Sequence, residues 1–131
     1  MDTLSLRLKN TREAGVCRLD CCPDELYAAA AEAGCVLFEV DLAGIAGKDN
    51  FIAAIARAVH APDWFGGNWD ALADLLGDLS WQPAMGYVLL LRHGDDTFGM
   101  DVGDYDLAMD VFADTTAFWR SQNKPFWVFF C

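Results

Sequence analysis

Basic side chains are scarce in this chain of 131 residues. Nine Lys and Arg stand against 20 Asp and Glu, which gives a formal net charge of −11. Nucleic acids and anionic membranes are held mainly by basic surfaces. We therefore expect no direct nucleic-acid partner and no membrane partner. An acidic surface favours a cationic protein partner, because opposite charges raise the rate of encounter.

Long apolar runs are also missing. The first residues, M-D-T-L-S-L-R-L-K-N-T-R, lack the apolar stretch of a signal peptide. No later segment reaches the roughly 18 apolar residues that are needed to cross a bilayer. We expect a cytoplasmic protein.

The five cysteines form no recognisable framework. They are odd in number and show no C-x-x-C spacing, so neither a complete disulfide set nor a zinc ribbon is indicated. We expect reduced, mostly buried thiols at Cys17, Cys21, Cys22, Cys35 and Cys131.

Residue patterns typical of catalysis are few. The only histidines are His60 and His93, and neither lies beside a nucleophile motif such as G-x-S-x-G. A P-loop is absent as well. We expect no catalytic residue, no cofactor and no metal. One alternative stays open, since His93, Asp95 and Asp96 are metal-ligand types within one glycine-containing loop and would suit a metal-dependent hydrolase.

Strand and helix patterns alternate along the chain. The length and an apolar content of 54% suit one domain, residues 1–131. The alternation predicts an α/β fold, a small parallel sheet of three to four strands covered by helices. Strand patterns occupy residues 3–8, 16–19, 35–42, 86–91 and 125–131, with one of the first two expected to pair, and helix patterns occupy 22–33, 48–60, 104–120 and the segment after residue 68. The 104–120 helix is expected to turn Leu107, Ala108, Val111, Phe112, Thr115, Phe118 and Trp119 toward the core.

The segment at residues 62–81, P-D-W-F-G-G-N-W-D-A-L-A-D-L-L-G-D-L-S-W, places charge where folding does not require it. Wound as a helix from Asn68, it brings Asp70, Asp74 and Asp78 within an arc of roughly 80°. We call these three residues the acidic stripe. The apolar residues of the segment, Trp69, Leu72, Leu75, Leu76 and Leu79, fall on the opposite arc and are expected to be buried. Like charges four residues apart cost about 0.2 to 0.5 kcal/mol per pair. The stripe is therefore either a binding surface or simply a solvated polar face.

The residues before the stripe predict a sharp entry into this helix. Gly66 and Gly67, which we call the elbow, allow positive φ, and Asn68 is a favourable N-cap. Of the aromatic pair before them, we expect Phe65 to be buried and Trp64 to be exposed. Two small residues within the helix, Ala73 and Gly77, leave its backbone open to a large partner.

The run W-F-G-G-N-W-D-A-L-A-D-L-L resembles the signature of the barstar family, bacterial proteins that inhibit secreted guanyl-type ribonucleases such as barnase. The resemblance covers residues 35–131 as a barstar-like core, and residues 1–34 form a strand–helix extension. It implies an intracellular inhibitor, not an enzyme, that is a monomer when free. The implied partner is a basic ribonuclease or a ribonuclease toxin, as in toxin–antitoxin or immunity pairs. The alternative within the family is a regulatory or scaffolding module without a nuclease partner.

The resemblance also implies roles for individual residues. Asp74 matches the acid that sits where a substrate phosphate would sit, Asp70 matches a second contact acid, and Trp64 matches the loop aromatic. A further acid of the family's surface matches Asp114 through A-M-D-V-F-A-D-T. The founding member has an acid in place of Gly67 and a tryptophan in place of Ala73. The implied partner-binding residues are Trp64, Gly66, Gly67, Asn68, Asp70, Ala73, Asp74, Asp78 and Asp114.

Overall fold

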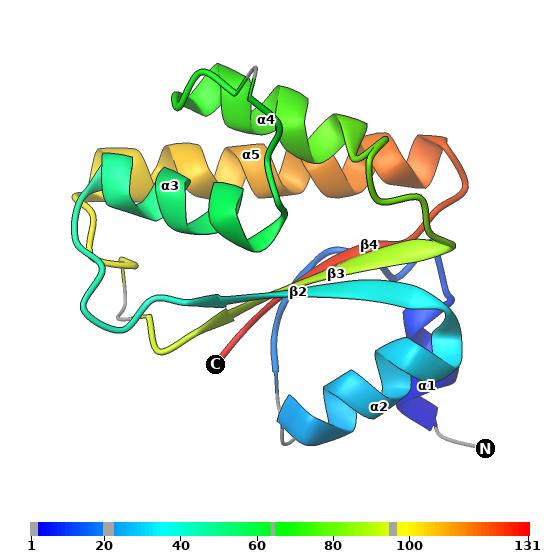
Figure 1. Ribbon diagram of the computed structural model, residues 1–131. Coiled ribbons are helices and arrows are strands. Elements are labelled where there is room, and N and C mark those ends of the chain that lie inside the picture. The colour runs from blue at the N-terminus through cyan, green and yellow to red at the C-terminus, as the bar shows by residue number, and fades with distance from the viewer. Residues whose placement is uncertain (1–2, 20–22, 64, 95–96) are drawn as a thin grey trace.

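The computed structural model describes residues 3–19, 23–63, 65–94 and 97–131. The described strands are β1 (Val16–Arg18), β2 (Cys35–Asp41), β3 (Gly86–Arg92) and β4 (Phe126–Phe130). The described helices are α1 (Thr3–Leu8), α2 (Pro23–Ala33), α3 (Lys48–Ala58), α4 (Trp69–Asp78) and α5 (Val102–Ser121). The strands form one parallel sheet in the order β1-β4-β3-β2, which confirms the predicted α/β fold (Figure 1).

Helices cover both faces of the sheet. Figure 1 shows α1 and α2 on one face and α3, α4 and α5 on the other. The inner strand β3 contributes side chains to both cores, because successive side chains of a strand point to opposite faces. Tyr87, Leu89 and Leu91 pack with the α3–α5 layer, whereas Val88 and Leu90 pack with α1 and α2. Burial on both faces explains why this strand is an unbroken apolar run.

Helix α4 forms the outermost part of its layer. Contacts with the sheet come from α3 and α5, and α4 packs mainly against α5 (Figure 1). Its predicted apolar arc is confirmed for the leucines, since Leu72, Leu75, Leu76 and Leu79 are fully buried. Trp69 is only partly buried. With one face buried in this way, the opposite face of α4 is left at the surface of the molecule.

The prediction of a strand at residues 3–8 is wrong, because this segment is the helix α1. The alternation of leucines suggested a strand, but Ser5 and Leu8, three positions apart, are buried together while Leu6 is half exposed. Three-residue spacing is the spacing of one helix face. The segment before β2 therefore contributes helix, strand and helix, and β1 is the part of it that joins the sheet.

The inner face of α5 is narrower than predicted. Leu107 and Phe118 are 46% and 44% exposed, whereas Ala108, Phe112 and Trp119 are buried. At about 100° per residue, Leu107 and Phe118 lie about 80 to 100° from the centre of the buried face. Both side chains therefore occupy one flank of the helix, and Asp114 lies on the same flank.

Candidate partner-binding site

The elbow and the cap position α4. Asn68 is extended (φ −122°, ψ 177°), and its side chain accepts a hydrogen bond of 2.7 Å from the backbone N–H of Ala71. This confirms the predicted N-cap, which satisfies one of the free N–H groups of the first turn. Gly67 has φ 78°, a conformation that side chains disfavour, so the elbow depends on glycine at this position.

Of the aromatic pair before the elbow, the structure describes Phe65. Phe65 packs against the larger core but is only partly buried, so its burial is less complete than predicted. It is followed directly by Gly66 and Gly67, which are both exposed. Trp64 lies outside the described residues.

The acidic stripe faces solvent as predicted. Asp70, Asp74 and Asp78 are all exposed. Within the described part of the chain, the ion pairs join Arg7 to Glu13, Arg92 to Glu39 and His93 to Asp41, and none of them includes the stripe. Asp70 complements the positive end of the helix dipole, but Asp78 opposes its negative end. The stripe as a whole is therefore not explained by the stability of α4.

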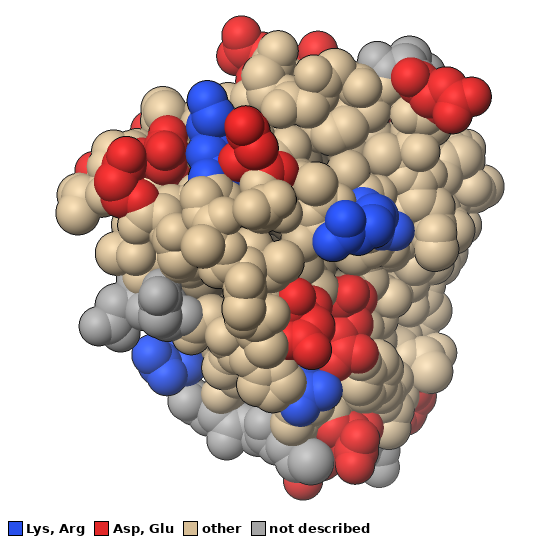
Figure 2. All heavy atoms as spheres, turned by 60° about the vertical axis from the view of Figure 1, so that its left-hand side comes forward, with Lys and Arg blue, Asp and Glu red and all other residues tan. Residues whose placement is uncertain are grey.

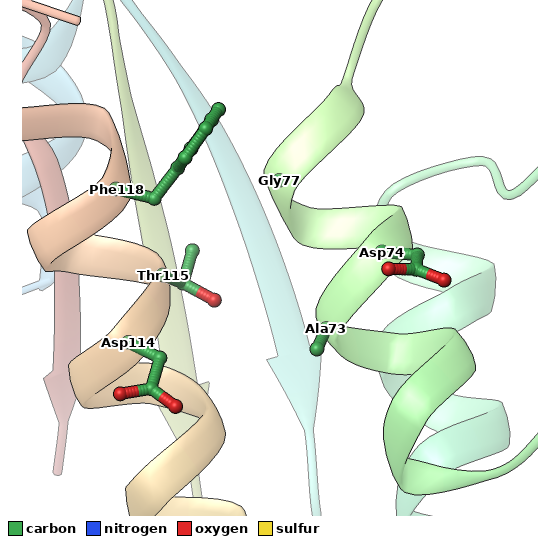
Figure 3. A pocket seen from close by; sticks show the side chains of 6 residues that line it. All are labelled: Ala73, Asp74, Gly77, Asp114, Thr115 and Phe118. Carbon is green, nitrogen blue, oxygen red and sulfur yellow. The ribbon is translucent and has the colours of Figure 1, made fainter. Parts of the chain in front are cut away.

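A hollow of about 300 Å³ lies between α4 and α5. It is lined by Ala73, Asp74 and Gly77 from α4 and by Asp114, Thr115 and Phe118 from α5, and we call these six residues the hollow. Figure 3 shows Ala73 and Gly77 on the side of α4 that faces α5, and the ring of Phe118 extending from α5 toward α4. The two carboxylates belong to opposite helices. The fold thus joins Asp114 to Ala73 and Asp74, three residues that the sequence analysis had placed in one site.

The sequence analysis missed two members of the hollow. Thr115 and Phe118 follow Asp114 by one and four positions on α5. Residues four apart share a helix flank, so once Asp114 was a candidate, this spacing was the available signal for Phe118. Both residues were instead assigned to the core, where only Thr115 is buried.

One hydrogen bond joins the two helices beside the hollow, and a second lies within α5. The indole N–H of Trp119 donates to the carbonyl oxygen of Leu76 across a distance of 2.8 Å, which joins α5 to α4. The hydroxyl of Thr115 donates to the carbonyl oxygen of Val111, also at 2.8 Å. The Trp119–Leu76 bond thus ties the two walls of the hollow to each other within the chain.

A second acidic region lies where β2 and β3 end. Glu39 accepts from Arg92 Nη1 at 2.7 Å and from the hydroxyl of Tyr27. Asp41 accepts from the backbone N–H of Ala43 at 3.0 Å and lies 2.9 Å from Nδ1 of His93. We call Tyr27, Glu39, Asp41, Arg92 and His93 the strand-end cluster.

Hydrogen bonding shifts the titration of this cluster. The hydrogen bond from Arg92, followed by that from Tyr27, lowers the pKa of the Glu39 carboxyl. The pKa of Asp41 is lowered by the Ala43 N–H and then by His93. Desolvation, followed by the hydrogen bond to Glu39, raises the pKa of Tyr27 to about 12. The acids of the strand-end cluster are thus stabilised in their ionised form by groups of the same chain.

The described residues give little support to the metal site that the sequence analysis left open at His93, Asp95 and Asp96. His93 already lies against Asp41, while Asp95 and Asp96 fall outside the described residues. Across residues 3–19, 23–63, 65–94 and 97–131, no group of three or more His, Cys, Asp or Glu is placed to hold a metal ion.

The described cysteines are free thiols at Cys17, Cys35 and Cys131. The first two are partly buried and the third is exposed, so burial is less complete than predicted. Burial raises the pKa of the Cys35 thiol. Cys21 and Cys22 lie outside the described residues.

The net negative charge is not gathered in a single patch. On the face drawn in Figure 2, Asp and Glu lie in several separate groups, with Lys and Arg between them. A net charge of −11 therefore does not by itself mark a site. None of the described helices is long and apolar enough to span a membrane.

One family model matches the chain, and its description is Barstar (barnase inhibitor). The match covers residues 35–131, from the start of β2 to the last residue, and so includes the elbow, α4 and α5. Neither the search of curated proteins nor the search of solved structures found a match. Because the family model accounts for most of the chain, including both helices that form the hollow, this protein belongs to the barstar family.

Proposed function

We propose that this protein inhibits a basic guanyl-type ribonuclease by covering its active site with the elbow and α4. The observation that carries the proposal is the acidic stripe, three exposed carboxylates without an ion pair among the described residues. A ribonuclease active site must hold a polyanionic substrate, so it offers the basic side chains that these carboxylates lack. Family membership supports the same partner class.

Most residues of the proposed site have a distinct role in such a complex. Asp74 takes the place of a substrate phosphate, and Asp70 and Asp78 add charge pairs around it. Gly66, Gly67 and Asn68 set the entry into α4, while Ala73 allows close approach. The proposed contact surface consists of Trp64, Gly66, Gly67, Asn68, Asp70, Ala73, Asp74, Asp78 and Asp114.

The inhibitor needs no catalytic group, cofactor or metal of its own. It acts in the cytoplasm as a monomer until it meets its ribonuclease or ribonuclease toxin. Opposite net charges would steer the encounter and orient the two proteins.

An inhibition titration against barnase, and against any ribonuclease encoded beside this gene, tests the proposal. The variant Asp70→Asn/Asp74→Asn removes two charges from α4 and is expected to abolish inhibition at concentrations where the native protein inhibits fully. The matched control, Asp24→Asn/Glu25→Gln, removes two exposed charges from α2 on the other face of the sheet. It is expected to inhibit like the native protein. Equal losses in both variants would mean that net charge, not this site, determines binding, and no inhibition by the native protein would refute the proposal.

A further inference from the structure

A cavity of about 330 Å³ lies where β2, β3 and β4 begin, at the opposite edge of the sheet from the strand-end cluster. In Figure 1 these three strands begin on the right-hand side. Part of the lining precedes residue 35, and part belongs to the segment that matches the family model. We call it the strand-start cavity, and its lining residues are Lys9, Thr11, Ala33, Cys35, Met85, Asn123 and Pro125.

Close packing holds the walls of this cavity together. A Cβ added to Gly86, the first residue of β3, would meet Pro125 Cγ at 2.7 Å and Cys35 Sγ at 3.1 Å. Glycine at this position therefore lets the starts of β2 and β3 and the segment before β4 approach one another closely. The guanidinium of Arg120 donates from Nη2 to the carbonyl oxygen of Ala14 at 2.6 Å, which ties the end of α5 to the segment after α1. The cavity is thus built by contacts of the fold.

One wall of the cavity is apolar and open to solvent. Met85 is 74% exposed, the largest fraction among the large apolar side chains that the structure describes. Ala33 and Pro125 in the same lining are buried. A methionine side chain is flexible and adapts its shape to what it contacts. A ligand with an apolar body would therefore gain stabilisation by removing this side chain from water.

Basic residues are concentrated in two segments that line the cavity, residues 9–12 and 120–125. These segments hold Lys9, Arg12, Arg120 and Lys124, four of the nine Lys and Arg of the chain, and no acid. Helices α1, α2 and α5 end at this edge of the sheet, and each C-terminus carries about half a negative charge. Even with Glu32 in the last turn of α2, the four cations outweigh these negative ends. Lys9 takes part in no ion pair among the described residues, so its ammonium is available to an anion.

We propose that the strand-start cavity binds a small organic carboxylate with an aromatic or branched apolar body. The ammonium of Lys9 pairs with the carboxylate, and the hydroxyl of Thr11 and the side-chain amide of Asn123 are further donors in the same lining. The apolar body lies against Met85 and Pro125. Ligand sites span about 300 to 1,000 Å³, so a cavity of about 330 Å³ suits a small molecule. The cavity shares no residue with the proposed ribonuclease-binding surface, and the inference does not depend on that function.

Titration of the ¹⁵N-labelled protein with 3-phenylpropionate, followed by NMR, tests the inference. Two matched compounds separate the parts of the ligand, since 3-phenylpropionamide keeps the body without the charge and propionate keeps the charge with a much smaller body. We expect saturable shifts of amides around residues 9–11, 33–35, 85 and 123–124 with 3-phenylpropionate. The amide and propionate should each bind several-fold more weakly.

A lysine variant tests the charge contact. Lys9→Gln should weaken the binding of 3-phenylpropionate roughly fivefold, the size of an exposed ion pair. The matched control Lys48→Gln changes the first residue of α3, which begins on the left-hand side of Figure 1, and should leave binding unchanged.

A negative charge on the apolar wall provides the decisive variant. Met85→Glu changes a side chain that is exposed enough to leave the fold intact, and it should abolish the shifts. Leu107→Glu makes the same change at another exposed apolar residue, near the start of α5, and should leave binding unchanged. The ¹⁵N spectra of both variants show directly whether they are folded.

Four results would each overturn the inference. They are a titration without saturable shifts at the cavity, equal binding of the acid and its amide, shifts spread over distant basic residues such as Arg57, and unchanged binding in Met85→Glu. None of them bears on ribonuclease inhibition, so the two proposals stand or fall separately.

Discussion

The acidic stripe on α4 and the strand-end cluster both contain exposed carboxylates, but the surroundings of these carboxylates differ. In the cluster, Glu39 is held by Arg92 and Tyr27, and Asp41 is held by Ala43 and His93. In the stripe, Asp70, Asp74 and Asp78 lie on one exposed arc without an ion pair among the described residues. The first arrangement satisfies its charges within the chain, and the second leaves its charges exposed to solvent.

This difference separates acids that support the fold from acids that we assign to binding. Hydrogen bonds to an ionised carboxylate favour the charged form, which is why the pKa of Glu39 and that of Asp41 are lowered. Overall acidity cannot make this distinction, because both regions add to the same net charge of −11. The hydrogen-bond and ion-pair partners of each carboxylate do distinguish the two regions.

The largest effect is expected on the buried side of α4, opposite the stripe. Leu76→Ala leaves a cavity beneath the hollow, at a position that is fully buried, and should lower the free energy of unfolding by about 2 to 5 kcal/mol. Chemical denaturation measures the loss. The control Leu6→Ala, at a half-exposed leucine of α1, should change stability by less than about 0.5 kcal/mol. Similar losses at the two positions would mean that α4 is not anchored by its leucines.

A smaller effect is expected at the helix cap. Asn68→Ala removes the acceptor for the Ala71 N–H and should cost about 1 kcal/mol of stability, whereas Asn68→Asp should keep most of it. Asp101→Ala, which removes the equivalent cap of α5, serves as the control. Both cap variants should lose stability in thermal unfolding, but only Asn68→Ala should also weaken ribonuclease inhibition, since it loosens the first turn of the stripe. Inhibition that is equally weakened in both would contradict this assignment.

The strand-end cluster predicts a dependence of stability on pH. The folded-state pKa of Glu39 lies below its unfolded value of about 4.3, so its contribution is present above that pH and is lost as the pH falls through the folded-state pKa. Glu39→Gln should therefore be less stable than the native protein at pH 7, and the difference should shrink as the pH is lowered below about 4. Denaturation curves at a series of pH values check this. A difference that is independent of pH would show that the charge of Glu39 is not what stabilises the fold.

The smallest effect is expected at the end of the stripe. Asp78→Asn relieves repulsion and an unfavourable dipole contact, so stability should stay the same or rise by a few tenths of a kcal/mol. Its effect on the ribonuclease complex should fall on the association rate, which is sensitive to charges at the rim, and should diminish as salt screens them. Surface-plasmon kinetics at low and high salt measures this. A slower association at both salt concentrations alike would argue against electrostatic steering.

The sequence predicted the local parts of the site better than the tertiary ones. The cap at Asn68 and the exposure of Asp70, Asp74 and Asp78 follow from helix period and capping chemistry, and the structure confirms them. The hollow could not be predicted from the sequence, because its volume depends on how α4 crosses α5. The exposure of Phe118 likewise depends on which flank of α5 that crossing leaves uncovered.

The error at residues 3–8 has a different cause. Six residues with alternating leucines fit a strand, and only the burial of Ser5 and Leu8 on one side reveals the helix. Short apolar segments do not determine their own secondary structure, because tertiary contacts outweigh local propensity.

A reciprocal comparison of Asp74→Ala and Glu39→Ala tests the central claim most directly. Each variant is measured twice, by denaturation and by the dissociation constant of its complex with barnase or with a ribonuclease encoded beside the gene. Asp74→Ala should unfold within about 0.5 kcal/mol of the native protein. Its dissociation constant should rise at least about 30-fold, the lower end of the effect known for buried interface charges, the barnase–barstar complex included. Glu39→Ala should lose stability and keep its affinity. If Asp74→Ala instead unfolds more easily and binds unchanged, the stripe belongs to the fold and the account is wrong.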